Sequence, residues 1–529
     1  MNILGNSLIG FRDVAGSSDT FRASNPATGE PFDPPFYSAT KAEVDLAAHL
    51  AADAFPVYSR LPPAERAAFL TRIASRIESL GELIIERAHL ETALPKPRLQ
   101  SETARTCNQL RLFASVVEEG SWVNARIDRP DPQRKPIPKP DIRSMLHPLG
   151  PVVVFGASNF PLAFSVAGGD TASALAAGNP VIVKAHPAHP GTGELVGCAI
   201  RDVVRELGLP EGVFSLLFDS GNNVGAALVQ HPLVKAGGFT GSIPAGRALM
   251  NLAASRPDPI PFFAEMGSTN PLFILPRALA ERGRDIAAQL VGSFTLGAGQ
   301  FCTKPGLVFL PESDSAPFLA DFQDKVARGP SFTLLTSGIR NSYQREIQNR
   351  KHRGDIATIA ESAAPAAVPA FLAAAAVFQT DVPTFLAHSD LAAEVFGPST
   401  LLIRFSSKEQ ILDAARDLHG HLTATIHGTH EDLREFADLV EILKNKVGRI
   451  IFNGYPTGVE VCHAMVHGGP YPASTDSRST SVGTQSIFRF ARPVCFQDFP
   501  GEALPLELQD ANPRGIWRML DGRLTRDQL

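Results

Sequence analysis

From Gly150 onward the sequence repeats one pattern: a short apolar run, a turn of small residues, then a segment with helical spacing. The first run, Val152–Phe155, is apolar throughout, as is typical of a strand covered on both faces. Four further runs follow at 181–183, 214–217, 234–239 and 261–264. Strands that alternate with helices form parallel sheets with helices on both faces. The pattern therefore predicts an α/β fold built on a doubly wound parallel sheet.

A second alternating region begins after Asn270-Pro271. A chain of 529 residues is too long for one compact core, so we expect more than one domain. In this region strands are expected at 272–275, 306–310, 401–403 and 447–453, and a helix over 279–296. We interpret the Ala- and Pro-rich residues 357–378 as a peripheral loop without chemistry, and 455–485 as a Gly/Pro/Ser-rich loop.

Charge and cysteine usage exclude several classes of protein. The net charge is −5 and no basic run appears, so no nucleic-acid partner is expected. The five cysteines are far apart and form no CxxC pair, which predicts a reducing, cytoplasmic location without disulfides or a cysteine-based zinc site. No long uninterrupted apolar stretch occurs, and the N-terminus lacks a basic start before an apolar core. We therefore expect neither a membrane span nor a signal peptide.

Small and polar residues follow the ends of the predicted strands. Asn159, Lys184, Gly221, Ser242 and Glu265 each lie just after one of them. Doubly wound sheets bind ligands at the carboxyl ends of their strands. The shared position of these residues predicts a binding site at that edge.

The turn Gly299-Gln300-Phe301-Cys302 separates an apolar helical segment from the next predicted strand. Small neighbours leave room for a substrate to reach the sulfur, and a thiolate is a strong nucleophile toward carbonyl carbon. A free cysteine is more often a small buried hydrophobe, so the turn alone does not assign a role to Cys302.

Six motifs in order resemble those of the aldehyde dehydrogenase superfamily, and the likeness covers nearly the whole chain. They are Asn159-Phe160-Pro161-Leu162, Lys184, Phe239-Thr240-Gly241-Ser242 with Gly246, Glu265-Met266-Gly267 with Asn270-Pro271, Gly299-Gln300-Phe301-Cys302, and Glu394-Val395-Phe396-Gly397-Pro398. The resemblance implies two doubly wound parallel-sheet domains and a small β oligomerisation ribbon. It places the cofactor-binding domain at 1–118 and 142–262, the catalytic domain at 263–465, the ribbon at 119–141 and 480–500, and a C-terminal extension at 501–529.

The resemblance also implies catalytic roles. Cys302 would attack an aldehyde to give a thiohemiacetal, whose oxyanion the Asn159 amide and the Cys302 backbone N–H would stabilise. Hydride would pass to a nicotinamide, leaving a thioester. Glu265 would act as the general base that activates water for its hydrolysis. Two alternatives remain: an inactive structural relative, and a cysteine acyltransferase or hydrolase that uses no nicotinamide.

The first βα turn lacks the GxGxxG fingerprint, and the resemblance implies a variant mode of cofactor binding. Lys184 would contact the adenosine ribose, and Ser242 would face the pyrophosphate at a helix N-terminus. The remaining implied contacts are Gly221 and Gly225 beside the adenine, Glu394 on the nicotinamide ribose, and Phe396 packing beside it.

Cofactor choice has a physical basis in Pro187. NAD-preferring members of the family often carry a glutamate three residues after the lysine, and Pro187 stands there instead. With no carboxylate to repel a 2′-phosphate, we expect NADP to be preferred and NAD to be accepted. His186 and His189 are interpreted as loop residues, and no metal site is predicted.

Outside the catalytic motifs the sequence resembles one branch of the family, chiefly in 461–473, 475–483 and 492–498. This branch contains 2-oxoglutarate semialdehyde (2,5-dioxopentanoate) dehydrogenases, which predicts that substrate. The alternative is an NADP-dependent long-chain fatty aldehyde dehydrogenase. An acidic substrate needs a cation near the thiol, for which Arg105, Arg111 and Arg478 are candidates. A homodimer or homotetramer is expected by analogy.

Two departures from the family pattern are Ser268 and Ala93. Many relatives carry glycine at both positions. We expect a minor effect at Ser268, because a small residue is kept, and a purely structural role at Ala93.

Overall fold

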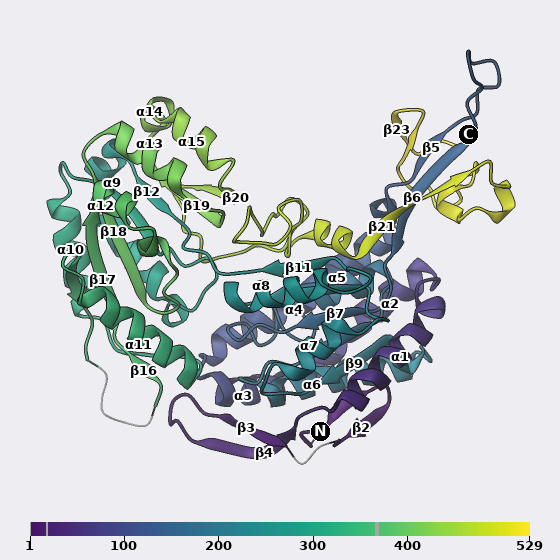
Figure 1. The fold of residues 1–529 in the computed structure, drawn as a ribbon, viewed down its shortest axis with the longest axis horizontal. Helices are drawn as coiled ribbons and strands as arrows, with labels where there is room; N and C mark the ends of the chain where they lie inside the picture. Colours follow the sequence, from purple (N-terminus) through teal and green to yellow (C-terminus); the bar gives the residue numbers. More distant parts are fainter. Residues whose placement is uncertain (1, 17–18, 365–369) are drawn as a thin grey trace.

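The computed structural model describes residues 2–16, 19–364 and 370–529. Figure 1 shows two large sheets side by side and a smaller sheet that projects from one of them. All five strands predicted between residues 150 and 265 are present, and they form the parallel part of the first sheet. They are β7 (Val152–Phe155), β8 (Val181–Lys184), β9 (Phe214–Leu217), β10 (Ala236–Thr240) and β11 (Phe262–Glu265).

The strand order of this first sheet is β11-β10-β7-β8-β9-β1-β2. The antiparallel strands β1 (Ser7–Ile9) and β2 (Arg12–Val14) complete one edge. The chain runs from β7 outward through β8 and β9, then returns to the other side of β7 for β10 and β11. The order therefore reverses between β7 and β10. Such a switch point opens a crevice at the carboxyl ends of the strands, where doubly wound sheets bind ligands.

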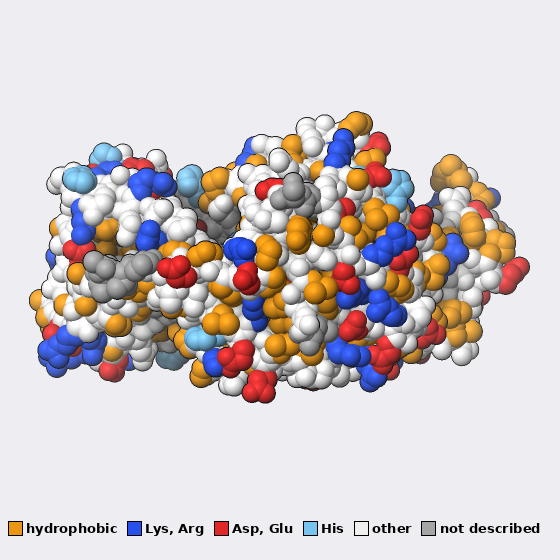
Figure 2. All heavy atoms as spheres, turned by 90° about the horizontal axis from the view of Figure 1, so that it is seen from below, with side chains coloured by type: hydrophobic (Ala, Val, Ile, Leu, Met, Phe, Trp, Pro, Cys, Tyr) orange, Lys and Arg blue, Asp and Glu red, His pale blue; other side chains and the backbone are white. Residues whose placement is uncertain are grey.

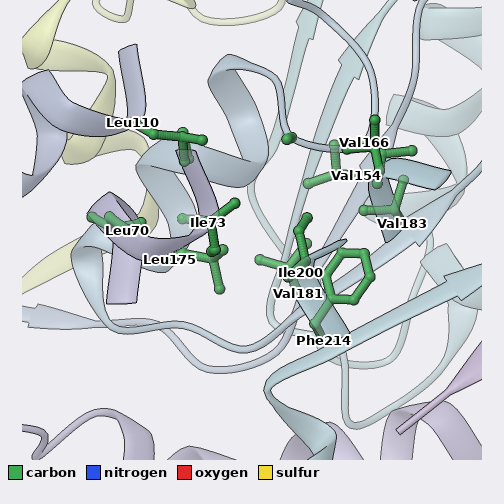
Figure 3. Close-up of a cluster of buried hydrophobic side chains, with 14 of the residues drawn as sticks. Leu70, Ile73, Leu110, Val154, Val166, Leu175, Val181, Val183, Ile200 and Phe214 are labelled. Atoms are coloured by element: carbon green, nitrogen blue, oxygen red, sulfur yellow. The ribbon is translucent and has the colours of Figure 1, made fainter. Parts of the chain in front are cut away.

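Helices cover both faces of this sheet because successive strand residues point to opposite sides. Val154, Val181 and Val183 belong to the core beneath one set of helices, which Figure 3 shows in close-up. That set is α2 (Pro63–Ser79), α3 (Gly81–Thr92), α4 (Lys96–Glu119), α5 (Gly169–Ala177) and α6 (Pro190–Glu206). Val153 and Ile182 face the other set, α1 (Lys41–Tyr58), α7 (Asn223–Gln230) and α8 (Ile243–Ala254).

The second sheet has the order β15-β17-β18-β13-β12-β19-β20 and is parallel except at β15. Its strands are β12 (Leu272–Ile274), β13 (Leu307–Pro311), β15 (Ala357–Glu361), β17 (Ala376–Asp381), β18 (Ser399–Phe405), β19 (His421–His427) and β20 (Val447–Phe452). Its longer helices are α9 (Pro276–Thr295), α10 (Ala316–Ala327), α11 (Ser337–Lys351) and α13 (Lys408–Asp417). The shorter helices are α12 (Val382–Ala387), α14 (His430–Glu435) and α15 (Ala437–Leu443).

The interpretation of 357–378 as a peripheral loop is wrong for the part of it that is described. β15 pairs with β17, and β17 pairs with β18 as an integral strand of the sheet. In addition β14 (Phe332–Thr333) pairs with β16 (Leu372–Ala373). Alanine is depleted in strands generally, so the alanine-rich composition gave no indication of a strand here. In the structure Val377 and Phe378 of this strand are fully buried. Residues 365–369 of the predicted loop lie outside the described part of the chain.

The projecting sheet has the order β21-β6-β5-β22-β23. Its strands are β5 (Arg126–Asp128), β6 (Ile142–Pro148), β21 (Ala491–Gln497), β22 (Arg518–Leu520) and β23 (Arg523–Thr525). Two features differ from the sequence-based boundaries. β6 lies beyond residue 141, and the expected C-terminal extension contributes two strands. Leu508 and Ile516 of the C-terminal segment are buried with Ile127 in a small separate core. This packing explains why the C-terminal segment joins the sheet.

The hairpin of β3 (Thr20–Ser24) and β4 (Pro31–Tyr37) lies at the lower edge in Figure 1. On the face shown in Figure 2, acidic and basic side chains are interspersed rather than gathered by sign. No helix within the described residues is long and apolar enough to cross a bilayer.

Candidate active site

Cys302 lies in the turn between α9 and β13, after a short 3-10 segment η3 (Leu296–Gly299). Gly299 adopts a φ of +67°, and a Cβ there would lie 2.2 Å from the carbonyl oxygen of Gly397. Only glycine fits this close approach. Beyond the turn, the Asn270 amide donates hydrogen bonds to the carbonyl oxygens of Cys302 (2.8 Å) and Lys304 (3.0 Å). The thiol is therefore held on a turn that is fixed from both sides.

Ser268 contributes more to this support than its small size suggests. Its hydroxyl donates to the Asn270 side-chain oxygen at 2.9 Å and accepts the backbone N–H of Leu422 at 3.0 Å. A glycine could form neither bond. The structure therefore links Ser268 to the Cys302 turn through Asn270, in contrast to the minor effect expected from sequence. At Ala93 the backbone is left-handed (φ 55°) at the end of α3, consistent with a structural role.

Asn159 lies against the same turn from the first sheet. Its side-chain N–H donates to the backbone carbonyl oxygen of Gln300 at 2.9 Å. The backbone carbonyl oxygen of Asn159 accepts a hydrogen bond from the Arg98 guanidinium at 2.8 Å. A carboxamide nitrogen carries two hydrogens, so one N–H remains for another acceptor. The structure thus brings Asn159 to the Cys302 turn, as the resemblance implied.

His467 joins Cys302 to Glu265 and was not predicted from sequence. Its Nε2 atom lies 3.5 Å from the Cys302 sulfur and 2.8 Å from Glu265 Oε1. The imidazole is 1% exposed and Glu265 is 2% exposed, so the pair is shielded from water. Cys302, Glu265 and His467 form one connected group at the junction of the two sheets.

The loop between β20 and β21 carries His467 to this place. It runs along the end of β11, where Met266 donates to the Ala473 carbonyl (2.8 Å) and Thr475 donates to the Ala264 carbonyl (3.0 Å). On the same loop the Ser481 hydroxyl donates to the Glu265 carboxylate, and the Ser481 backbone N–H donates to the His467 carbonyl at 2.8 Å. The segment interpreted only as a Gly/Pro/Ser-rich loop therefore forms one wall of the site.

The charges in this group set the protonation of the thiol. Burial raises the pKa of Cys302 well above its ordinary value, the charges of Glu265 and Glu394 raise it further, and Arg105 opposes them. Burial also acts to raise the pKa of Glu265, but His467, Ser481 and Arg489 outweigh it, so that this pKa is lowered overall. At neutral pH the thiol is therefore protonated and the carboxylate charged. A thiol in that state needs a neighbouring base to become a nucleophile.

One nitrogen of His467 faces both partners. In a Ser-His-Asp triad the two imidazole nitrogens contact different groups. Here Nε2 alone contacts the sulfur and the carboxylate, while Nδ1 has no hydrogen-bond partner among the described residues. Nε2 can accept the thiol proton when it is unprotonated, while Glu265 Oε1 lies beside it without a hydrogen-bond partner among the described residues. This arrangement can hold the thiol proton on the imidazole beside a carboxylate that stays charged.

Most of the proposed cofactor-binding residues lie at or just beyond the carboxyl ends of β8, β9 and β10 in the first sheet. The Lys184 ammonium donates to the Asp219 carbonyl at 2.7 Å, and burial lowers the pKa of Lys184 to about 8 against the opposing charge of Asp219. The Asp219 carboxylate accepts the N–H groups of Gly221 (2.9 Å) and Val224 (3.2 Å) at the start of α7. The turn after β9 is thereby fixed beside Lys184.

The N-terminus of α8 fits an anionic ligand. Ser242 is exposed at its N-cap and forms no side-chain capping bond, so the N–H groups of Ile243 and Ala245 remain available, whereas Pro244 between them has none. Gly225 permits α7 to pack closely on β7, since a Cβ there would lie 2.9 Å from the Phe155 ring. These features suit a dinucleotide bound along the carboxyl edge of the strands.

Glu394 lies on the opposite side, against the Glu265-Met266-Gly267 segment. A Cβ on Gly267 would lie 2.1 Å from Glu394 Oε2, so glycine is required for this contact. Burial raises the pKa of Glu394, with Lys304 opposing, and burial lowers the pKa of Lys304. The Lys304 ammonium donates to the carbonyls of Val395 (2.7 Å) and Ser399 (2.8 Å) and so fixes this segment, on which Phe396 is half-buried.

Two groups of side chains bear on the expectation that no metal is bound. The His186 and His189 rings stack at 5.4 Å, but His189 Nε2 contacts the Ala157 carbonyl and His186 Nδ1 accepts from Ala188. Their contacts are with the backbone, as in an ordinary loop. The donor atoms of Glu265, Cys302 and His467 all lie within 4.8 Å of one another, a set that could also hold a metal ion.

Comparison with known proteins gives consistent matches over most of the chain. The model of the aldehyde dehydrogenase family matches residues 14–481. The chain is 50% identical to alpha-ketoglutaric semialdehyde dehydrogenase 2 of Azospirillum brasilense, over 99% of this chain and 100% of that protein. It is 45% identical to alpha-ketoglutaric semialdehyde dehydrogenase of Acinetobacter baylyi, over 99% of each. Among solved structures, betaine aldehyde dehydrogenase of Staphylococcus aureus is similar in fold, with a TM-score of 0.80 at 19% identity, covering 94% of this chain and 97% of that one.

Proposed function

Because this chain belongs to the aldehyde dehydrogenase family, we propose that it oxidises 2,5-dioxopentanoate, the semialdehyde of 2-oxoglutarate, to 2-oxoglutarate with a nicotinamide dinucleotide. The observation that carries the proposal is the Cys302–His467–Glu265 group in a chain that is 50% identical, end to end, to a relative named for that substrate. The site explains how an aldehyde would be oxidised, and the relatives indicate which aldehyde.

In the proposed reaction the thiol proton moves from Cys302 to His467 Nε2 as the sulfur bonds to the aldehyde carbon. The carbonyl π electrons move to oxygen, which becomes an oxyanion. The free N–H of the Asn159 amide and the Cys302 backbone N–H would stabilise it, each donor contributing about 3 kcal/mol. Asn159 is preorganised for this role because its other N–H is already bonded to Gln300.

Hydride loss from the thiohemiacetal requires an acceptor, which a bound nicotinamide would supply. The chain's own residues position that group: the α8 N-terminus at Ser242 would hold its diphosphate, and Lys184 and Glu394 would hold its two riboses. The acyl group that remains bonded to the Cys302 sulfur is then a thioester. Glu265 would remove a proton from water as the water oxygen attacks the thioester carbon, and the sulfur leaves as a thiolate. Because Glu265 is buried, water molecules other than the one it activates are kept away from the thioester at this step.

Cofactor preference is proposed to favour NADP. Pro187 stands where a carboxylate would repel a 2′-phosphate, and the Lys184 ammonium lies at the end of the neighbouring strand β8. NAD lacks the 2′-phosphate and would lose only the ion pair between that phosphate and Lys184. The enzyme should therefore still use NAD.

The projecting sheet is proposed as the contact between subunits in a homodimer or homotetramer. It carries several large apolar side chains that are substantially exposed in the single chain, among them Ile137 (68%), Leu524 (65%) and Trp517 (46%). Exposed apolar groups of this kind mark interaction surfaces. Light scattering that shows only a 56.6 kDa species at micromolar concentration would refute this assembly.

The substrate is tested by comparing aldehydes with both cofactors under reducing conditions. We expect kcat/KM for 2,5-dioxopentanoate to exceed that for a long-chain aldehyde such as decanal by at least about tenfold, since a polar site rejects a substrate that leaves it unpaired. NADP should give a lower KM than NAD. Faster oxidation of decanal would favour a fatty aldehyde dehydrogenase. Absence of cofactor reduction with every aldehyde would exclude dehydrogenase activity altogether.

His467 is tested by the alkylation of Cys302 with iodoacetamide, followed by peptide mapping. In His467→Gln we expect the rate at neutral pH to fall about 100-fold, the scale on which a positioned base contributes. Since burial raises the thiol pKa, removing the proton acceptor should also move the pH profile to higher pH. His463→Gln, exposed on the same loop, is the matched control and should match the wild type. An unchanged profile in His467→Gln would remove this residue from thiol activation.

A further inference from the structure

Arg105 on α4 has a buried guanidinium with no acceptor. Its Nη1 and Nη2 atoms are inaccessible to solvent and form no hydrogen bond within the described part of the chain. Its Cζ lies 5.1 Å over the ring of Phe164, which fixes the guanidinium in place. A buried charged group without a partner is costly, so a site of this kind is completed by a ligand that supplies acceptors.

The position of Arg105 relates it to the reacting sulfur. The Phe164 ring beneath it lies 6.2 Å from the His467 ring, and His467 contacts the sulfur. The charge of Arg105 is also close enough to oppose the rise in the pKa of Cys302. Arg105 therefore lies close to the reacting sulfur, separated from His467 by the Phe164 ring.

Neighbouring acids do not neutralise Arg105 by direct pairing. Glu102, one turn earlier, uses Oε1 to accept the N–H groups of Leu162 (2.9 Å) and Ala163 (3.0 Å). Glu265 is paired with His467, and Glu460 is exposed on the loop. Among the described residues none of the three acids forms an ion pair with Arg105. The nearby charges, chiefly that of Glu102, act on Arg105 at a distance, and its terminal N–H groups remain without an acceptor.

The other cations near the site or suggested by the sequence are already engaged. Arg111 pairs with Glu78 on the outer side of α4, and Arg478 pairs with Asp476 while its side chain is 89% exposed. Closer to the thiol, Arg98 donates to the Asn159 carbonyl, and Arg449 donates to the carbonyls of Pro456 and Gly458. Of the arginines considered, Arg105 alone has both terminal nitrogens unpaired.

We propose that Arg105 binds the carboxylate of the substrate and thereby makes the site selective for short aldehydes that end in a carboxylate or 2-oxo-carboxylate. This inference rests on the proposed function. The planar guanidinium fork matches a carboxylate through two parallel N–H···O bonds. In 2,5-dioxopentanoate four carbon–carbon bonds separate the aldehyde carbon from the carboxylate carbon, a reach of about 5 Å. The proposal requires a substrate of that length to place its aldehyde at Cys302 and its acid group at Arg105 beside Phe164.

The test compares Arg105→Met with the wild type on 2,5-dioxopentanoate and on pentanal, a neutral aldehyde of equal length. We expect kcat/KM for the keto acid to fall about 100-fold, mainly through KM, the scale of losing charged hydrogen bonds. Activity on pentanal should fall much less than activity on the keto acid, because with pentanal only the effect of the Arg105 charge on the Cys302 thiol is lost. Inhibition by the product 2-oxoglutarate, measured with pentanal as substrate, should weaken to a similar extent. Arg111→Met on the same helix is the control and should match the wild type on both aldehydes.

Equal losses on both aldehydes in Arg105→Met would overturn the proposal, because they would indicate a structural role. Unchanged kinetics would overturn it as well, since the carboxylate would then bind elsewhere. Should the methionine variant fail to fold, Arg105→Lys keeps a charge but loses the fork and should weaken 2-oxoglutarate binding alone. A wild-type enzyme without preference for the keto acid over pentanal would overturn the proposed substrate and, with it, the role of Arg105. A preference that persists in the variants would overturn only the latter.

Discussion

Replacing Cys302 by alanine should abolish aldehyde oxidation, with a loss of kcat on the order of 10⁵-fold or more, as for other covalent nucleophiles. Without the sulfur no thiohemiacetal forms, and the hydrate of the aldehyde is not held where the Asn159 amide can stabilise its oxyanion. Steady-state cofactor reduction measures the loss. Binding of NADP, followed by fluorescence, should be unchanged because the proposed cofactor-binding residues lie on the first sheet and on the Glu394 segment.

The matched control is Cys495→Ala, which removes the exposed thiol on β21. It should retain wild-type kinetics. Aldehyde oxidation that survives in Cys302→Ala, with protein purified free of host dehydrogenases, would refute the covalent route.

Glu265→Gln should separate the two halves of the reaction. A glutamine cannot take a proton from water, so hydrolysis of the thioester should slow by about 10³-fold, within the range of a lost general base. Formation of the thioester depends on Cys302, His467 and Asn159, which remain. Rapid mixing should therefore show one equivalent of reduced cofactor per site, followed by almost no turnover.

The pH dependence of the wild type provides a further check on Glu265. The pKa of Glu265 is lowered overall. Its carboxylate therefore stays charged as pH falls through the range in which an ordinary glutamate becomes protonated. Hydrolysis of the thioester should be retained there and lost only at lower pH. Steady turnover in Glu265→Gln without an initial burst would show that another group activates the water.

Much of the fold could be predicted because its signals are local. The buried strands of the first sheet are uninterrupted apolar runs, and the residues after them fall on one edge by the geometry of a parallel sheet. Glu265 ends β11 of that sheet, Cys302 lies in the turn between α9 and β13, and the structure places both side chains beside His467. β15 and β17 were missed because alanine-rich strands lack the β-branched residues that mark a strand, and their burial depends on pairing with β18.

The remainder of the site depends on contacts between distant segments. His467 lies 165 residues beyond Cys302, on a loop whose path along β11 is set by backbone hydrogen bonds that leave no pattern in sequence. The choice among the arginines has a similar basis. Arg111 and Arg105 are alike in sequence, and only the pairing of Arg111 with Glu78 on the neighbouring helix α2 shows which one is free.

The most direct test of the covalent mechanism is the mass of the Cys302 peptide from Glu265→Gln, quenched in acid after one turnover with NADP and 2,5-dioxopentanoate. We expect a 2-oxoglutaryl thioester on Cys302, in an amount equal to the reduced cofactor formed and removable by hydroxylamine. Reduced cofactor formed while Cys302 remains unmodified, or an acyl group found on another residue, would contradict the covalent mechanism.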